Sequence, residues 1–131
     1  MCVFCKIINN EIPSKKVYED EDVLAILDLS QLTYGHTLVM PKAHYATLLD
    51  SPNDVRAKLI NVTCCLANKI KKNLNAEGVN IVNNSGEAAG QTVMHTHIHI
   101  IPRYNGDEFG FREVNHEGKY DLDEVLSKIN K

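Results

Sequence analysis

Three histidines alternate with other residues in the segment from His95 to Ile101, which reads His-Thr-His-Ile-His-Ile-Ile. Successive side chains of a β-strand point to opposite faces, so the three imidazoles would share one face, about 6.6 Å apart from one to the next. The residues between them would enter a core. A lone histidine on a strand is most often an ordinary hydrogen-bonded residue. A row of three indicates metal coordination, histidine-based chemistry, or both.

Two cysteines near the start, Cys2 and Cys5, have the two-residue spacing that lets both thiolates bind one zinc ion. Two more ligands are needed, and the chain contains six histidines. His44 follows a predicted strand that stops at Pro41, where a chain reversal would bring it to the sheet edge. Two cysteines, His44 and one strand histidine would form a complete, closed set, and a closed zinc site is structural. Ordinary buried thiols and a surface histidine are the alternative.

The polar segment 83–92 lies directly before the histidine row and supplies glycines, carboxamides, hydroxyls and backbone N–H groups. Such a loop can surround an anion without a net positive charge, although a plain turn has the same composition. Its position favours the anion, because the loop ends three residues before His95. A histidine beside a bound phosphorus centre is a good nucleophile when a hydrogen bond fixes its far nitrogen.

The elements that position these residues follow from apolar periodicity and turn signals. Strands are predicted at 17–19, 23–29, 36–40, 79–82 and 94–101, and a C-terminal helix at 121–131. Five strands, two real helices and hairpin-length links favour an α+β fold with an antiparallel sheet.

A long helix is predicted over 52–75. Ser51 should be its N-cap, with Pro52 and Asp54 in the first and third positions, and Gly78 should close it. Its core-facing residues follow helical spacing, and Cys64 and Cys65 should be buried with them. These core positions are Val55, Leu59, Val62, Leu66, Ile70 and Leu74.

The composition describes one globular domain over residues 1–131. The 44% hydrophobic content of 131 residues is enough for a core, and the formal net charge of −3 gives no basis for binding nucleic acid. No apolar run is long enough to span a membrane. The cysteine pattern is typical of a reducing compartment, so we expect a cytoplasmic protein.

The histidine run is similar to the His-x-His-x-His-x-x signature of the histidine triad (HIT) superfamily of nucleotide hydrolases and transferases. The chain most resembles the Hint branch, the purine nucleoside phosphoramidate hydrolases, which are homodimers with the HIT fold. Residues 103–131 extend beyond the end of well-known animal Hint proteins, and we expect this extension to pack on the domain. The resemblance covers residues 2–103 and includes the segments 2–8, 11–14, 27–28, 35–44 and 90–93.

The resemblance implies a role for each matched residue. His97 would attack the α-phosphorus and form a nucleotidyl-histidine intermediate, which water would hydrolyse. His99 would contact the phosphate oxygens and stabilise charge as the leaving group departs, and His36 would support the phosphate region. The Gln91 and Thr92 side chains would contact phosphate oxygens, in a segment with Gly90 and Val93. Asp28 would bind the ribose hydroxyls, and Asn83 would lie near the ribose-phosphate. An apolar slot for the purine would be formed by Phe4, Ile7, Ile26, Leu27 and Leu29.

The same resemblance implies a structural zinc ion held by Cys2, Cys5, His44 and His95, and a homodimer. A second apolar strip on the long helix, at Ile60, Cys64 and Ala67, would suit a two-fold interface. The expected ligand is a purine nucleotide, AMP or GMP, or one of its phosphoramidates. Two alternatives stay open: a dinucleoside polyphosphate hydrolase of the Fhit type, and a zinc-stabilised module that binds a nucleotide or protein with residual activity.

Overall fold

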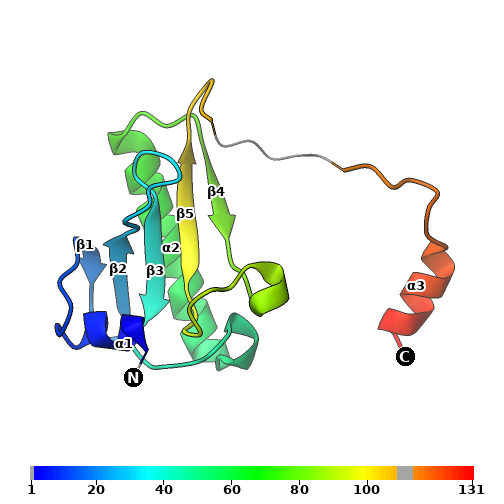
Figure 1. The fold of residues 1–131 in the computed structure, drawn as a ribbon, viewed down its shortest axis with the longest axis horizontal. Coiled ribbons are helices and arrows are strands. Elements are labelled where there is room, and N and C mark those ends of the chain that lie inside the picture. The colour runs from blue at the N-terminus through cyan, green and yellow to red at the C-terminus, as the bar shows by residue number, and fades with distance from the viewer. Residues whose placement is uncertain (1, 109–113) are drawn as a thin grey trace.

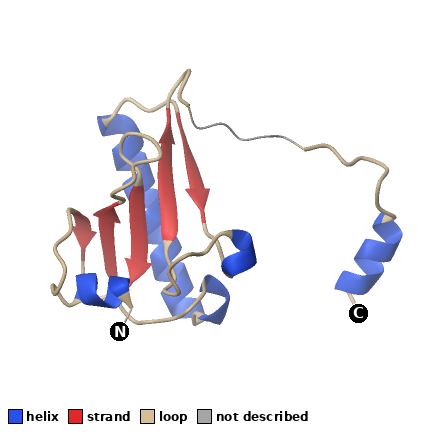
Figure 2. Cartoon of the chain, in the orientation of Figure 1, coloured by secondary structure: helices blue, strands red, loops and turns tan. Residues whose placement is uncertain are grey.

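A five-stranded antiparallel sheet in the order β1-β2-β3-β5-β4 forms the centre of the computed structural model, which describes residues 2–108 and 114–131. Figures 1 and 2 show α2 running behind the sheet and α1 lying across the lower end of its front face. The strands are β1 (Lys16–Glu19), β2 (Val23–Leu27), β3 (Thr37–Pro41), β4 (Gly78–Val82) and β5 (Ile98–Arg103), and the helices are α1 (Val3–Ile8), α2 (Asn53–Asn73) and α3 (Leu122–Ile129), with short 3-10 turns at Leu48–Asp50 and Glu87–Ala89.

The two faces of the sheet bury different side chains, as strand alternation requires. On the rear face, Ala25 and Val39 pack with Leu59 and Ile70 of α2. On the front face, the second core cluster places α1 on the sheet through Phe4, Ile7, Leu24, Ile26, Leu38 and Met40. This architecture confirms the predicted α+β fold. No helix within the described residues has the length and apolar character to cross a membrane.

Both ends of α2 differ from the prediction. Pro52, and not Ser51, is the N-cap, and it makes no side-chain cap bond. Ser51 is buried, and its hydroxyl donates to the Thr47 carbonyl oxygen at 3.1 Å. Ser51 therefore anchors the preceding turn. The helix ends at Asn73, and Asn75 takes the left-handed conformation (φ 56°) expected of a terminating residue. Gly78 instead begins β4.

The prediction that Cys64 and Cys65 lie in the core is wrong, since both are exposed. The proposed second strip on α2 is also only partly correct. Ile60 and Cys64 are exposed, but Ala67 is 7% exposed and belongs to the core beneath the helix. Ala67 is one residue from Leu66, and α2 is covered broadly enough by the sheet to bury both.

The histidine strand is shorter than predicted, because β5 begins at Ile98. Residues before it find hydrogen-bond partners outside the sheet: the Thr96 N–H donates to the Tyr45 carbonyl at 2.7 Å, and the His97 carbonyl accepts from the Asn83 amide at 2.9 Å. The predicted strand at 23–29 likewise ends at Leu27. There the Asp28 carboxylate accepts the Ser30 N–H at 2.7 Å and turns the chain.

Among the described residues of the C-terminal extension, those at its start contact the domain. The Arg103 guanidinium donates to Asn80 at 2.8 Å and to Asp107 at 2.9 Å, and the Tyr104 hydroxyl donates to the Tyr34 carbonyl at 2.7 Å. Every residue from 114 to 131 is exposed, and α3 stands away from the sheet (Figure 1). Residues 114–131 therefore do not pack on their own domain in the way expected for the extension.

Candidate functional site

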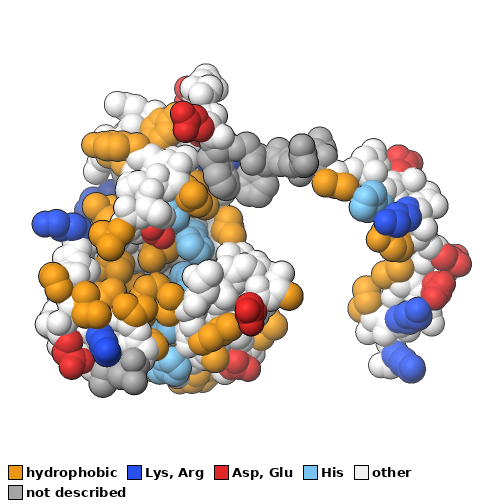
Figure 3. Space-filling view, in the orientation of Figure 1, with side chains coloured by type: hydrophobic (Ala, Val, Ile, Leu, Met, Phe, Trp, Pro, Cys, Tyr) orange, Lys and Arg blue, Asp and Glu red, His pale blue; other side chains and the backbone are white. Residues whose placement is uncertain are grey.

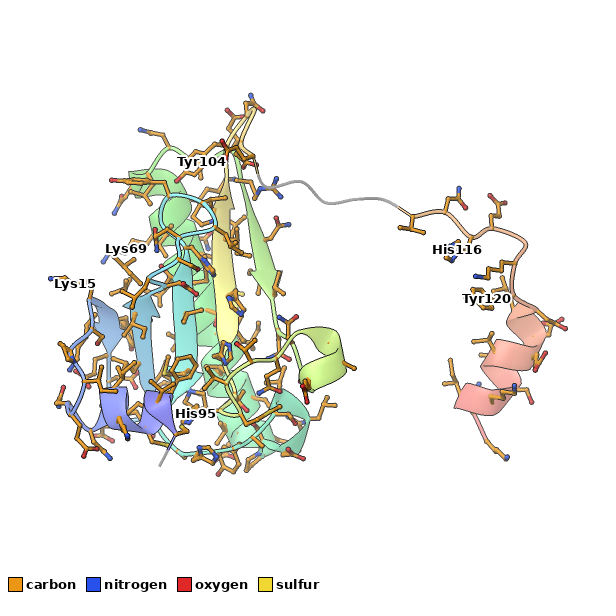
Figure 4. The ribbon with its side chains drawn as sticks, viewed as in Figure 1. Lys15, Lys69, His95, Tyr104, His116 and Tyr120 are labelled. Atoms are coloured by element: carbon orange, nitrogen blue, oxygen red, sulfur yellow. The ribbon has the colours of Figure 1, made fainter. Side chains whose placement is uncertain are left out.

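The three imidazoles form a row on the front face of the sheet although only His99 lies within β5. The rings of His97 and His99 are 5.0 Å apart between centroids, and Phe4 of α1 meets the His97 ring edge-on at 4.9 Å. His95 lies at the lower end of the row, beside α1 (Figure 4). Figure 3 shows the histidines as a pale blue line bordered by apolar side chains. The predicted common face is therefore present, with a tighter spacing between rings.

The hydrogen bonds of His97 determine which of its nitrogens is free. Its Nδ1 lies 2.7 Å from the His95 carbonyl oxygen, which can only accept, so Nδ1 carries the proton. The Nε2 lone pair is then available. Burial lowers the pKa of His97, against the opposing effect of the backbone bond, and keeps the ring neutral. A neutral, oriented imidazole with a free Nε2 has the properties of a nucleophile.

His99 has the opposite tautomer, set by His36. The Leu32 N–H donates to His36 Nδ1 at 3.2 Å, so the His36 proton lies on Nε2. That Nε2–H donates to His99 Nδ1 at 2.9 Å, which places the His99 proton on Nε2. Burial and the neighbouring imidazoles lower the pKa of His99 to about 4. The row thus presents a lone pair on His97 beside an N–H donor on His99.

His36 is held in place by the turn before β3. It is 1% exposed, and Gly35 before it has φ 98°, a conformation that favours glycine. A Cβ on Gly35 would also collide with the Leu74 side chain, because the turn passes close under the end of α2. The sequence segment 35–36 therefore fixes the ring that orients His99.

A cleft of about 280 Å³ opens beside the histidine row. Asp28 lies at its edge. Burial raises the pKa of its carboxyl, but hydrogen bonds from Ser30, together with the nearby His36 and His99, hold that pKa below the usual range. Leu29, at the rim, is 98% exposed. Ten predicted residues line the cleft: Phe4, Ile7, Ile26, Leu27, Asp28, Leu29, Thr92, Val93, His97 and His99.

Sequence reasoning missed two lining residues, Val3 and Leu38. Leu38 could have been found, because it is directly opposite Ile26 in the β2–β3 ladder and so shares its face. Val3 has no such signal, since its position depends on how α1 lies across the sheet.

Three residues predicted to bind the ligand hold or shape the backbone near the cleft. The Gln91 side chain is 3% exposed, donates to the carbonyls of Ala46 and Val93, and accepts from the Gly86 N–H. Its donors are thus already paired, which differs from the predicted contact with phosphate. Asn83 similarly holds the His97 carbonyl. Gly90 ends the 3-10 turn with φ 96°.

The four predicted zinc ligands come together around one point. Their donor atoms, the Sγ atoms of Cys2 and Cys5 and the Nδ1 atoms of His44 and His95, lie within 4.8 Å of one another. The four Sγ–Nδ1 distances run from 3.4 to 3.7 Å. A tetrahedron with Zn–S near 2.3 Å and Zn–N near 2.0–2.1 Å requires about 3.6 Å between sulfur and nitrogen. The donor set therefore fits zinc in type and in spacing.

The outer contacts of His95 also fit a metal ligand. Its Nε2 lies 2.8 Å from the Pro41 carbonyl oxygen and must donate to it, which leaves the Nδ1 lone pair directed at the cysteines. A second cluster of Asp28, His36 and His99 has suitable atoms but the wrong protonation. His36 Nδ1 already accepts a backbone N–H, so its Nε2 carries a proton and cannot bind a metal while the ring is neutral.

An α+β fold with an antiparallel sheet, a row of histidines, an apolar cleft and a Cys-Cys-His-His cluster is typical of histidine triad proteins. The chain matches the HIT domain family over residues 9–106 and belongs to that family, which comprises hydrolases and nucleotide-binding proteins. It is 52% identical to an uncharacterised HIT-like protein of Methanocaldococcus jannaschii, over 98% of both chains. It is also 42% identical to the adenylylsulfatase HINT3 of Arabidopsis thaliana, over 98% of this chain and 65% of that protein.

Solved structures agree with the fold along almost the whole chain. A Streptococcus mutans protein has a TM-score of 0.93 at 48% identity, covering 98% of this chain and 83% of its own. A HIT family member from Bacillus subtilis scores 0.91 at 44% identity, covering 98% and 94%. A zinc-bound histidine triad protein from Mycobacterium smegmatis scores 0.80 at 41% identity, covering 98% and 95%.

Proposed function

We propose that this HIT protein hydrolyses purine nucleoside phosphoramidates through a covalent nucleotidyl-histidine intermediate on His97. The observation that carries the proposal is the hydrogen bond from His97 Nδ1–H to the His95 carbonyl, at 2.7 Å, which leaves Nε2 as a lone pair at the cleft. A module that only binds nucleotides has no use for an oriented, neutral nucleophile beside a complementary donor.

The cleft offers each part of such a substrate a matching surface. The purine would lie on the apolar side formed by Phe4, Ile7 and Ile26, and the Asp28 carboxylate would accept hydrogen bonds from the ribose hydroxyls. The α-phosphate would then lie between His97 and His99. AMP and GMP satisfy these requirements equally, so the proposal extends to both.

The reaction would proceed by two displacements at phosphorus. His97 Nε2 forms a bond to the α-phosphorus as the P–N bond breaks, and the departing amine takes up a proton from solvent. His99 Nε2–H donates a hydrogen bond to the charge that develops on the transferring group. Water then attacks the phosphorus, releases a proton and breaks the bond to His97, which regenerates the neutral ring. Thr92, exposed at the cleft, is the remaining side chain placed to contact a phosphate oxygen.

Two other leaving groups test the specificity of the site. The relation to an Arabidopsis adenylylsulfatase favours adenosine 5′-phosphosulfate as a second substrate, and the Fhit alternative predicts cleavage of dinucleoside polyphosphates. AMP release from these two compounds and from adenosine 5′-phosphoramidate should be compared as kcat/KM. The proposal expects the phosphoramidate to be preferred. A higher kcat/KM for either of the others would assign the leaving group to that class.

The Cys2–Cys5–His44–His95 cluster would hold one structural zinc ion, as its donor set and spacing support. Zinc bound there would link α1 to the loop after β3 and to the start of the histidine row, with no ligand position left for water. Cys2, Cys5, Cys64 and Cys65 are all free thiols. The cytoplasmic location stays a prediction.

The protein would act as a homodimer. Cys64 and Asn68 of α2, together with Val79 and Ile81 of β4, line an open groove of about 290 Å³. β4 is an edge strand, and its Ile81 is 44% exposed. An unpaired edge beside an apolar groove is a surface that a second copy can cover. Light scattering at micromolar concentration should give about twice the chain mass of 14.7 kDa.

A further inference from the structure

The loop of residues 28–36 connects β2 to β3 and carries a residue of the site at each end, Asp28 and His36. In Figure 1 this loop lies at the upper end of the two strands, whereas α1 crosses their lower end. His95, a member of the Cys-Cys-His-His cluster, is also at the lower end (Figure 4). The loop therefore needs a support other than the metal cluster to keep Asp28 and His36 in register.

Gln31, in the middle of this loop, has a backbone conformation that side chains rarely adopt. Its φ is 45°, in the left-handed region. The other described non-glycine residues with positive φ are Asn10 and Asn75, and asparagine tolerates that region better than glutamine does. Strain of this kind persists where the surrounding contacts impose it, and it is common at functional sites. The contacts of Gln31 show what imposes it.

The Gln31 side chain bonds the backbone of the loop at three points. Its Nε2 donates to the Asp28 carbonyl oxygen at 2.6 Å and to the His36 carbonyl oxygen at 2.7 Å. Its Oε1 accepts the Gly35 N–H at 2.9 Å. Both N–H bonds and the oxygen of one carboxamide are thus used within the loop. We call these three hydrogen bonds the Gln31 clasp, and they join the end of β2 to the start of β3.

The backbone of Gln31 aims the amide group that follows it. The left-handed turn at Gln31 directs the Leu32 N–H at His36 Nδ1, 3.2 Å away. That bond places the His36 proton on Nε2, which donates to His99 Nδ1 at 2.9 Å. The orientation of the peptide after Gln31 therefore determines which nitrogen of His99 carries the proton at the cleft.

We propose that Gln31 is a positioning residue for the hydrolysis of phosphoramidates, and this inference rests on that proposed function. The clasp fixes the carboxylate that would bind the ribose, on Asp28, relative to His36. The backbone turn aims the Leu32 N–H and so sets the tautomer of His99. Gln31 is not among the described residues that line the cleft, so it acts through these neighbours and does not touch the substrate.

Two substitutions of Gln31 test the proposal in the full-length chain. Gln31→Gly adopts the left-handed conformation without strain but loses the clasp. It should lower kcat/KM for adenosine 5′-phosphoramidate by about tenfold and raise the Kd for AMP by about threefold or more, because Asp28 and His36 are no longer joined. Gln31→Glu keeps the length of the side chain and an acceptor for the Gly35 N–H. Its carboxylate would face two carbonyl oxygens, so its losses should exceed those of Gln31→Gly.

Thr33→Val is the matched control in the same loop. It removes the hydrogen bond from the buried Thr33 hydroxyl to the Pro102 carbonyl oxygen, at 2.6 Å, and leaves the clasp intact. Like Gln31→Gly, it should lower the melting temperature, since each variant loses hydrogen bonds of this loop. At a temperature well below both transitions, Thr33→Val should keep kcat/KM and the Kd for AMP within about twofold of the wild-type values.

The ¹⁵N chemical shifts of the His99 ring report its tautomer without requiring turnover. A mixed tautomer population and weaker AMP binding in both Gln31 variants, with wild-type values in Thr33→Val, support the proposal. Wild-type shifts and a wild-type Kd in folded Gln31→Gly and Gln31→Glu would overturn it. Equal losses in Thr33→Val would also overturn it, because they would follow from the stability of the loop alone. If the wild-type protein fails to cleave the phosphoramidate, the proposed function fails, and the shifts and the Kd for AMP still decide the role of Gln31.

Discussion

Replacing His36 should impair catalysis without touching the nucleophile, because His36 fixes the tautomer of His99. In the structure, His36 Nε2–H donates to His99 Nδ1 at 2.9 Å, in surroundings where His36 is 1% exposed. His36→Leu removes this donor and leaves two partly buried groups, the Leu32 N–H and His99 Nδ1, without their partner. His99 could then carry its proton on Nδ1, which would present a lone pair, and no donor, to the substrate.

The size of the effect follows from the bond that is lost. Leaving a buried donor or acceptor unsatisfied costs about 1–3 kcal/mol. If the transition state bears that cost, kcat/KM falls by about 5- to 150-fold at 1.4 kcal/mol per factor of ten. His36→Gln is the matched control, since its side-chain amide can donate from near the position of Nε2 and should recover part of the loss.

Two measurements are needed together: kcat/KM for adenosine 5′-phosphoramidate, and the ¹⁵N chemical shifts of the His99 ring, which distinguish its tautomers. In His36→Leu, we expect lower kcat/KM and a changed tautomer population. Unchanged kcat/KM in a folded His36→Leu variant would refute the reasoning. So would a large loss of activity with the tautomer of His99 unaltered.

Three further predictions concern the nucleophile, the metal cluster and acid stability. His97→Ala should lower turnover by about 10³-fold or more while nucleotide binding, measured by calorimetry, largely persists. His116→Ala, in the exposed segment after β5, should leave turnover unchanged. Removal of zinc by a chelator, or the change Cys5→Ser, should lower the melting temperature by on the order of 10 °C, whereas Cys65→Ser, at an exposed thiol outside the groove, should have little effect. A chelator-treated protein with an unaltered melting temperature would argue against a structural metal. Because the pKa of His99 is lowered from 6.5 to about 4, the unfolded chain binds more protons than the native chain between these values. The free energy of unfolding should therefore decrease by on the order of 2 kcal/mol as pH falls from about 6.5 to 4, after allowance for the partial exposure of the ring. A free energy of unfolding that stays constant across this pH range, measured by denaturant titration, would contradict this prediction.

The sequence was most informative where spacing alone determines geometry. The alternation of His95, His97 and His99 placed three rings on one face even though β5 begins only at Ile98. The Cys-x-x-Cys spacing, with His44 after a strand end, predicted a cluster completed by one strand histidine, and the family resemblance identified that histidine as His95. Both patterns survive small errors in element boundaries, because they depend on local backbone direction.

Features that depend on how distant segments meet could not be predicted. The tautomers of His36 and His99 depend on a backbone N–H at Leu32, and nothing in the sequence pattern indicates that contact. The role of Gln91 changed because its amide meets the Ala46 carbonyl, 45 residues away in the chain. Local competition caused the remaining errors: Ser51 bonds to the turn before α2 and not to the helix, and Asn75 terminates α2 ahead of Gly78.

The stereochemical course at phosphorus tests the central claim most directly. The substrate would be an adenosine 5′-phosphoramidate made chiral at the α-phosphorus by sulfur, hydrolysed in ¹⁸O-labelled water. Two in-line displacements, the first by His97 and the second by water, invert the configuration twice, so the account predicts net retention. Net inversion would show that water attacks the substrate directly, and it would contradict the covalent nucleotidyl-histidine intermediate.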